Sequence, residues 1–151
     1  MRKYFLVPAV LLLAGFYVSA QQNKKPGAAQ SPDYKIPPEA VNQANPVKPS
    51  DESLAHAKKI WGFDCAMCHG ANGDGKGDVA VDAKWKLQDY RDPDALKDRT
   101  DGELFYIIKN GKGAMPAEGS RAKTNEIWDL VNYIRAFAKK EAPAKGSASS
   151  Q

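Results

Sequence analysis

The chain has 151 residues, with 22 lysines and arginines against 18 aspartates and glutamates, so its formal net charge is +4. This length allows one domain of ordinary size. The excess positive charge lies in the N-terminal part, because residues 50–140 hold equal numbers of acidic and basic side chains. Nucleic-acid binding requires a concentrated basic face and is therefore not expected.

The first 20 residues have the pattern of a secretory signal. Two basic residues precede a short apolar run that is interrupted by Pro8, and small residues suit cleavage before Gln21. The apolar run is short for a membrane span. We therefore expect residues 1–20 to be a signal peptide, the mature chain to be exported to the periplasm, and no membrane span in that mature chain. An uncleaved N-terminal anchor is the alternative.

The next segment, residues 21–49, is rich in proline and poor in apolar side chains. This composition predicts a linker in extended, partly polyproline-like conformations. Residues 50–140 are the expected folded domain, and residues 141–151 are expected to form a disordered tail. Three apolar side chains could attach part of the linker to the domain: Ile36, Val41 and Val47.

Two helices are predicted in the first part of the domain. One begins after Ser50, a favourable N-cap, and has acidic residues in its first turn and an apolar stripe up to Trp61. The other begins at a capping box formed by Thr100 and Glu103. Gly111 is expected to end it, because glycine is common directly after a helix.

A third helix is predicted from Thr124, the expected N-cap, to the lysine pair at 139 and 140. Its apolar residues recur at helical spacing along one face. No strand pattern separates these helices, so we predict an all-α domain of three to four helices with long loops. Three modest helices bury little apolar surface, and domains this small often need an additional stabilising group.

Both cysteines and one of the two histidines lie in one motif, Cys-x-x-Cys-His, at Cys65, Cys68 and His69. This motif is the attachment pattern for c-type haem. Positions i and i+3 of a helical turn point the same way, so each thiol can form a thioether to a haem vinyl group. His69 would then lie under the iron as its proximal ligand, and the haem would supply the missing core.

Other sites fit the motif and the glycine-rich loop after it less well. A phosphate-binding P-loop needs Ser or Thr at Gly77 and a strand before Gly70. A calcium loop fails because Lys76 stands at a ligand position and Ala83 replaces the final Glu. Zinc would need His56 beside the three motif ligands. A redox Cys-x-x-Cys pair should open a helix in an α/β fold, whereas this motif ends a helix. A disulfide is the remaining alternative.

Met115 is the candidate for the sixth iron ligand. Once the signal is removed, Met67 and Met115 are the remaining thioethers, and Met67 is held between the two anchored cysteines. Met115 lies on a glycine-containing loop that allows close backbone approach, and Pro116 stiffens the chain beyond it. The alternatives are an ordinary methionine at this position and His56 as the sixth ligand.

With these features, residues 50–140 resemble a class I c-type cytochrome, a small protein with a single haem. Trp61 matches the aromatic position of the family's N-terminal helix, and Ala57 matches its small position. Leu130 and Tyr133 match the C-terminal helix that crosses it. The resemblance implies the cytochrome c fold, with these two helices packed nearly perpendicularly beside one covalently bound haem c.

The resemblance also covers the distal ligand loop, since Met115 followed by proline matches it, and it implies His69 and Met115 as axial ligands. One departure is clear. Many relatives have a proline shortly after the glycine-rich loop, whose carbonyl orients the axial histidine, but this chain has Gly77, Asp78 and Val79 there. Three residues are candidates for hydrogen bonds to the haem propionates, with core or exposed roles equally open to them: Trp85, Tyr90 and Arg91.

The ligand set predicts a one-electron carrier and no enzymatic activity. With His69 and Met115 bound, the iron is six-coordinate and has no place for a substrate. The soft sulfur ligand favours ferrous iron and raises the potential relative to two histidines. We expect Fe(II)/Fe(III) cycling between redox partner proteins, such as a dehydrogenase, an oxidase or a membrane respiratory complex. The alternative is a haem enzyme or gas-binding protein with an open or labile sixth site.

Overall fold

The computed structural model describes residues 34–141, with side-chain surroundings up to residue 138. The expected signal peptide and residues 142–151 of the expected tail lie outside this range. Between residues 34 and 141 the chain forms helices and loops, and an isolated bridge pairs Lys112 with Met115. The all-α prediction is confirmed. No helix in the described part is long and apolar enough to cross a membrane.

The three predicted helices correspond to α2 (Asp51–Ile60), α5 (Asp101–Asn110) and α6 (Thr124–Glu141). A π-helix, η1 (Trp61–Cys65), and α3 (Ala66–His69) continue α2 without a break. Two short helices were not predicted, α1 (Pro38–Val41) and α4 (Asp78–Asp82). Helices this short carry too few residues for an apolar period to show, so the chain has more helical segments than the three to four expected.

The predicted helix ends are largely confirmed. Ser50 and Ser53 form a capping box at α2, and Thr100 and Glu103 form one at α5, where the Thr100 N–H donates to Glu103 Oε2 at 2.8 Å. Gly111 ends α5 with a φ of 75°, a conformation that glycine adopts without strain. The prediction of Thr124 as an N-cap was wrong, because α6 already begins at this residue.

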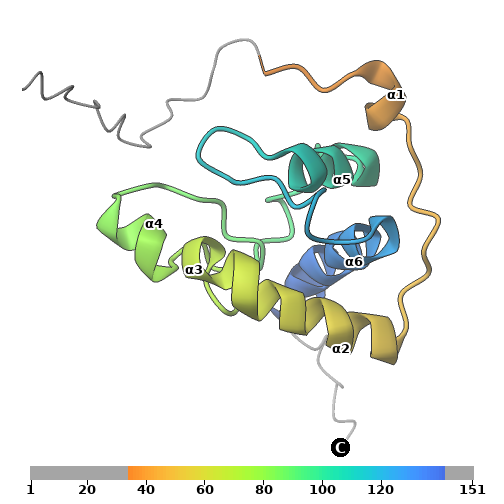
Figure 1. Ribbon diagram of the computed structural model, residues 1–151. Helices are drawn as coiled ribbons and strands as arrows, with labels where there is room; N and C mark the ends of the chain where they lie inside the picture. The colour runs from red at the N-terminus through yellow and green to blue at the C-terminus, as the bar shows by residue number, and fades with distance from the viewer. Residues whose placement is uncertain (1–33, 142–151) are drawn as a thin grey trace, which may run out of the picture.

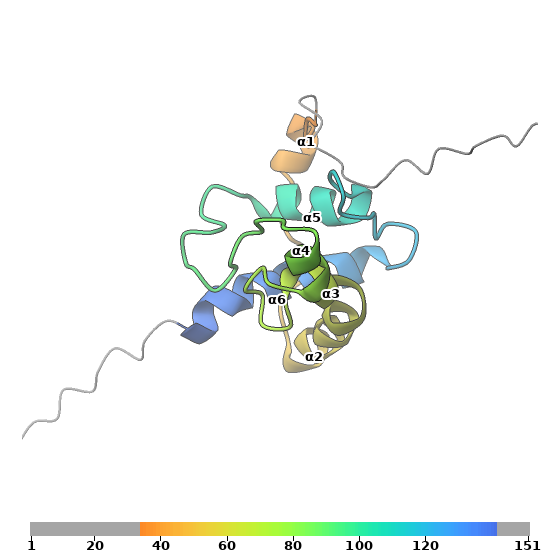
Figure 2. The ribbon, with the colours of Figure 1, turned by 90° about the vertical axis from the view of Figure 1, so that its left-hand side faces the viewer.

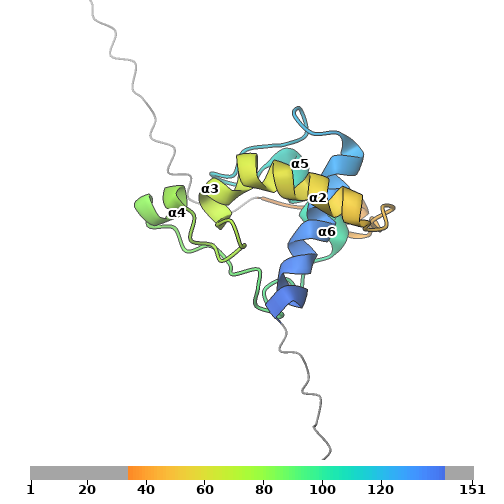
Figure 3. The same ribbon diagram turned by 90° about the horizontal axis from the view of Figure 1, so that it is seen from below.

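The core forms where α2 crosses α6 (Figure 3). Ala57 and Val131 are fully buried, and the small side chain of Ala57 allows the two helices to approach closely. Trp61 and Leu130 are 2% and 1% exposed. The positions on which the resemblance rests therefore form the contact between the N- and C-terminal helices, and α5 closes the core by stacking Phe105 on Trp128.

Residues 34–49, which we call the N-terminal strap, differ from the expected linker. The strap is mostly extended, but it carries α1, which lies on α5, and it then runs past α6 to the start of α2 (Figures 1 and 2). The Thr100 hydroxyl donates to the carbonyl oxygen of Val41 at 2.8 Å. Of the three apolar side chains expected to attach this segment, Val47 packs against the core.

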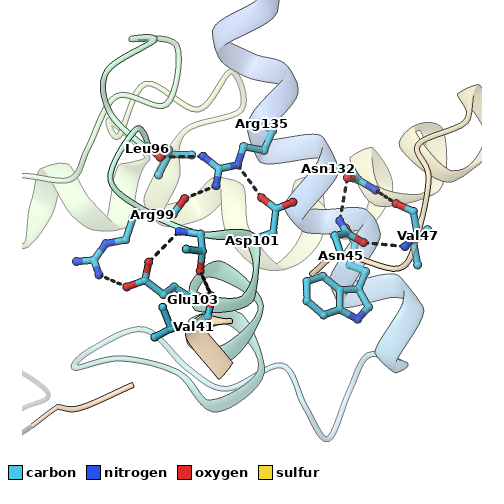
Figure 4. A network of polar contacts seen from close by, with 11 residues as sticks. Val41, Asn45, Val47, Leu96, Arg99, Asp101, Glu103, Asn132 and Arg135 are labelled. Atoms are coloured by element: carbon cyan, nitrogen blue, oxygen red, sulfur yellow. Dashed lines mark hydrogen bonds and ion pairs between the residues drawn. The ribbon is translucent and has the colours of Figure 1, made fainter. Parts of the chain in front are cut away.

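A pair of asparagines holds the strap to α6 (Figure 4). Asn45 Nδ2 donates to Asn132 Oδ1 at 2.9 Å, and Asn132 Nδ2 donates to the carbonyl oxygen of Val47 at 3.0 Å. Asn45 Oδ1 accepts from the N–H of Val47 at 2.9 Å. Composition alone could not show this, because the same polar residues suit a solvated linker as well as a specific hydrogen-bonded contact.

At Gly102 the backbone of α5 lies in close contact with the backbone of the strap. A methyl group there would overlap the carbonyl oxygen of Ala40 and lie 2.7 Å from that of Gln43. We expect Gly102→Ala to displace α1 and to lower the free energy of unfolding by about 1–3 kcal/mol, despite the better helix propensity of alanine. Chemical denaturation measures this change.

Gly62→Ala is the matched control, because Gly62 is also helical and nothing lies within 4 Å of the added methyl group. We expect it to stabilise the protein by about 0.5–1 kcal/mol. If both substitutions changed the free energy of unfolding equally, the strap would not be in close contact with α5 at Gly102.

Candidate haem site

The Cys-x-x-Cys-His motif lies on one continuous helical segment, with Cys65 at the end of η1 and with Cys68 and His69 in α3. The glycine-rich loop folds back onto it. The N–H groups of Gly75 and Gly77 donate to the carbonyl oxygens of His69 and Cys68, at 2.8 and 3.1 Å. A methyl group at Gly77 would overlap two backbone carbonyls of α3, so glycine is required for this close return.

Trp61 fixes the end of the motif from inside the core. Its buried Nε1–H donates to the carbonyl oxygen of Gly70 at 3.1 Å. Gly70 has a φ of 80° and terminates α3 directly after His69. The position of the histidine is therefore set by a buried hydrogen bond as well as by helix geometry.

The two thiols are free and half-buried. Burial, and then the negative charges of Glu118 and Asp64, raise the pKa of Cys65 to about 12. Burial also raises the pKa of Cys68 above its ordinary value. Redox-active Cys-x-x-Cys pairs have a thiol with a lowered pKa. These cysteines are protonated at neutral pH, which disfavours the alternative of a redox pair and leaves both thiols for covalent attachment.

The His69 ring contacts two aromatic side chains. It stacks on Tyr90, with ring centroids 5.4 Å apart, and lies 5.8 Å from Trp61. Burial lowers the pKa of His69, so its imidazole is neutral and able to bind a metal. Its Nδ1 atom is buried without a hydrogen-bond partner among the described residues. A buried, unpaired nitrogen of this kind fits a histidine that serves a metal centre.

Met115 belongs to the loop between α5 and α6. In Figure 1 this loop extends to the same side of the molecule as α3 and the segment between α4 and α5. The backbones of Lys112 and Met115 hydrogen-bond to each other in both directions at 3.0 Å. The Met115 side chain is half-buried and packs against the core, as do Cys65 and Tyr90. The structure thus places the predicted distal ligand in a turn that the backbone pairing of Lys112 and Met115 closes.

An ion-pair cluster that the sequence analysis did not predict joins this loop to the haem-attachment segment. Arg121 pairs with Glu118, which follows Met115 closely, and its Nη2 atom lies 3.2 Å from Asp64 Oδ1 in η1. Glu118 is 3% exposed, and its second carboxylate oxygen has no hydrogen-bond partner in the described part of the chain. The i,i+3 spacing of Glu118 and Arg121 was visible in the sequence, but the contact with Asp64 was not.

The zinc alternative is not supported by the arrangement of ligands. His56 lies on the exposed side of α2, with its side chain 49% exposed, and its Nε2 atom is 3.7 Å from Glu126 Oε1. Among the described residues, no group of three or more His, Cys, Asp or Glu side chains is arranged to hold a metal ion. His56 is therefore neither a fourth zinc ligand nor placed as an alternative axial ligand.

The three candidate propionate partners have different surroundings. Tyr90 has a core role, because it contacts both Trp61 and His69, and burial raises its pKa to about 12. Arg91 pairs with Asp89 at 2.6 Å and holds the pKa of that carboxyl at about 2. Trp85 is half-exposed. The segment between α4 and α5, which contains these three residues, is held to α6 near its end. There Arg135 donates to the carbonyl oxygen of Leu96 at 2.8 Å (Figure 4).

Comparisons with known proteins agree with this site. The family described as cytochrome C oxidase, cbb3-type, subunit III, matches residues 52–134, which is more than half of the chain. Cytochrome c6 of Cladophora glomerata is 34% identical over 88 residues, covering 55% of this chain and 87% of the relative. Cytochrome c6 of Pyropia tenera is 29% identical over 87 residues, covering 58% of this chain and 95% of the relative.

The fold also matches a solved structure, that of the Kuenenia stuttgartiensis reducing HAO-like protein complex Kustc0457/Kustc0458. The TM-score is 0.53 at 21% sequence identity, and the match covers 72% of this chain and 51% of that chain. The residues of the site fit haem, because two free thiols and a neutral, half-buried histidine lie on one helical segment. The chain therefore belongs to this cytochrome c family and is a small class I c-type cytochrome, a haem-binding electron carrier with one covalently bound haem c.

Proposed function

We propose that this protein is an exported, periplasmic one-electron carrier in which Cys65 and Cys68 hold the haem and His69 and Met115 bind its iron. The observation that carries this proposal is the continuous segment from η1 to α3, which presents two free thiols and a histidine with a buried, unpaired nitrogen. The bound haem supplies the one-electron chemistry, and the protein's contribution is to hold the ligands.

Contacts among the described residues would hold both proposed iron ligands, His69 and Met115, in fixed positions. The Trp61 hydrogen bond to Gly70 and the glycine loop hold the proximal histidine in place. The backbone hydrogen bonds between Lys112 and Met115 close the turn that would present the Met115 sulfur to the iron. With His69 and Met115 both bound, the iron would have no free position for a substrate, and the sulfur ligand would raise the reduction potential. These features suit a carrier better than an enzyme.

Exposed apolar side chains next to the haem-attachment residues suit transient contact with a redox partner protein. Phe63 is 82% exposed and Met67 is 54% exposed, and both lie within the segment that carries the cysteines. Contiguous exposed apolar patches commonly mark protein contacts, and Phe63 and Met67 lie four residues apart on one continuous helical segment. A dehydrogenase, an oxidase or another respiratory complex is the proposed class of partner, either as a free encounter or as a dedicated assembly.

The first test is the absorption spectrum of the purified protein, oxidised and then reduced. We expect sharp c-type bands on reduction and, in the oxidised form, the weak far-red band of sulfur-to-iron ligation. Cys65→Ala should leave a single thioether and shift the pyridine haemochrome band, which checks the attachment residues. A haem spectrum without the far-red band would favour the open-site alternative, and no haem from a host able to attach it would contradict the proposal.

A further inference from the structure

Tyr34, at the beginning of the N-terminal strap, contacts the loop that carries Met115. Its hydroxyl donates to the carbonyl oxygen of Gly111 at 3.0 Å, across 77 positions of sequence. Its ring meets Tyr106 of α5 edge-on, with centroids 6.4 Å apart, and the Lys112 ammonium lies 5.6 Å from the ring centroid. One side chain of the strap thus contacts α5 and the first two residues of the loop.

The two loop residues that Tyr34 contacts are the ones that position the Met115 backbone. Lys112 exchanges both backbone hydrogen bonds with Met115 at 3.0 Å. Gly111 lies so close to the carbonyl group of Met115 that an added methyl would be 2.6 Å from its oxygen. A displacement of Gly111 or Lys112 would therefore be transmitted directly to Met115.

We propose that Tyr34 is a positioning residue for the sixth iron ligand, and that the N-terminal strap serves to hold the Met115 loop closed. The inference rests on the proposed ligation of iron by Met115. Tyr34 does not touch the iron ligand itself and acts through the backbone of Gly111 and the side chain of Lys112.

The rest of the strap lowers the entropic cost of the hydrogen bond between Tyr34 and Gly111. Its later residues are held independently, by Thr100 on the carbonyl of Val41 and by the Asn45–Asn132 pair on α6. Because these contacts already order the strap, little additional conformational entropy is lost when Tyr34 reaches Gly111. The phenol of Tyr34 is protonated at neutral pH and can donate, and burial and the neighbouring Tyr106 raise its pKa further.

The experiment compares the full haem-loaded protein with Tyr34→Phe and Asn45→Ala. Tyr34→Phe keeps the ring and removes only the hydroxyl donor to Gly111. Asn45→Ala releases the strap at α6, in a contact that involves neither Gly111 nor Lys112. The probe is imidazole at saturating concentration on the oxidised protein, where loss of the far-red band reports how fast Met115 leaves the iron. Urea unfolding of each variant is measured in parallel.

We expect Tyr34→Phe to speed the replacement of Met115 by imidazole about 2- to 10-fold, the effect of losing one hydrogen bond. Asn45→Ala should lower the urea midpoint but raise the replacement rate less than Tyr34→Phe does, because Thr100 still holds the strap at Val41. An unchanged rate in Tyr34→Phe, or an equal increase in both variants, would overturn the role of Tyr34 while leaving Met115 ligation intact. Absence of the far-red band in the unsubstituted protein would overturn the ligation and this inference together.

Discussion

Replacing Met115 with alanine is expected to leave the haem attached but to lower its reduction potential by on the order of 0.1–0.2 V, a fraction of the roughly 0.8 V range that axial ligands span. The thioether is the soft ligand that favours ferrous iron, and alanine offers no donor in its place. The oxidised variant should lose the far-red band and bind cyanide, and the reduced variant should bind carbon monoxide. Potentiometric titration and ligand-difference spectra measure these changes.

Met67→Ala is the control, because it removes the same thioether group from an exposed position, where the side chain is 54% exposed. Its potential and its ligand reactivity should equal those of the unsubstituted protein. An unchanged potential in Met115→Ala would contradict the assignment of Met115 as the sixth ligand. Cyanide or carbon monoxide binding by the unsubstituted protein would instead support a haem enzyme or gas-binding protein with a labile sixth site.

Replacing Trp61 with alanine is expected to lower the free energy of unfolding by about 3–5 kcal/mol. The indole is 2% exposed and lies 5.1 Å from the Phe137 ring and 5.9 Å from the Tyr133 ring, measured between centroids. The substitution leaves a cavity at the crossing of the N- and C-terminal helices and removes the hydrogen bond to Gly70. Urea or guanidinium unfolding of the haem-loaded protein measures the loss.

Two further variants separate the contributions to this loss. Trp61→Phe keeps an aromatic ring and removes the hydrogen bond, so a loss of about 1–2 kcal/mol is expected. Trp85→Ala removes the same side chain from a half-exposed position outside the core and should cost less than Trp61→Ala. If the two alanine variants were equally destabilised, the helix crossing would not be the main source of stability in this domain.

The ion-pair cluster of Arg121 with Glu118 and Asp64 is one of two contacts that restrain the loop carrying Met115. It joins the chain after Met115 to η1, which carries Cys65. Together with the contact of Tyr34 on Gly111, it holds the Met115 loop at both of its ends. The loop contains Gly111, Gly113 and Gly119, which allow many backbone conformations, and these contacts restrict it.

The main helices could be predicted because their signals are local. The N-cap Ser50 of α2, the capping box of α5 and the apolar period of α6 each lie within a few turns of sequence. The short helices α1 and α4 and the π-helix η1 have no such signal, because their formation depends on the segments packed around them. The N-cap of α6 was placed one residue late, within the range over which fraying helix ends are defined.

The sequence alone determined how the haem is attached, because the Cys-x-x-Cys-His spacing is the attachment pattern of haem c, and it offered Met115 as the candidate for the sixth ligand. Only the tertiary structure decided which distant residues support that chemistry. Tyr34 lies 77 positions from Gly111, and Asn45 lies 87 positions from Asn132. No periodicity in the sequence relates residues so far apart. The strap, which contains Tyr34 and Asn45, has the composition of a free linker. Its place is set by hydrogen bonds and close backbone contacts that exist only once α5 and α6 have packed.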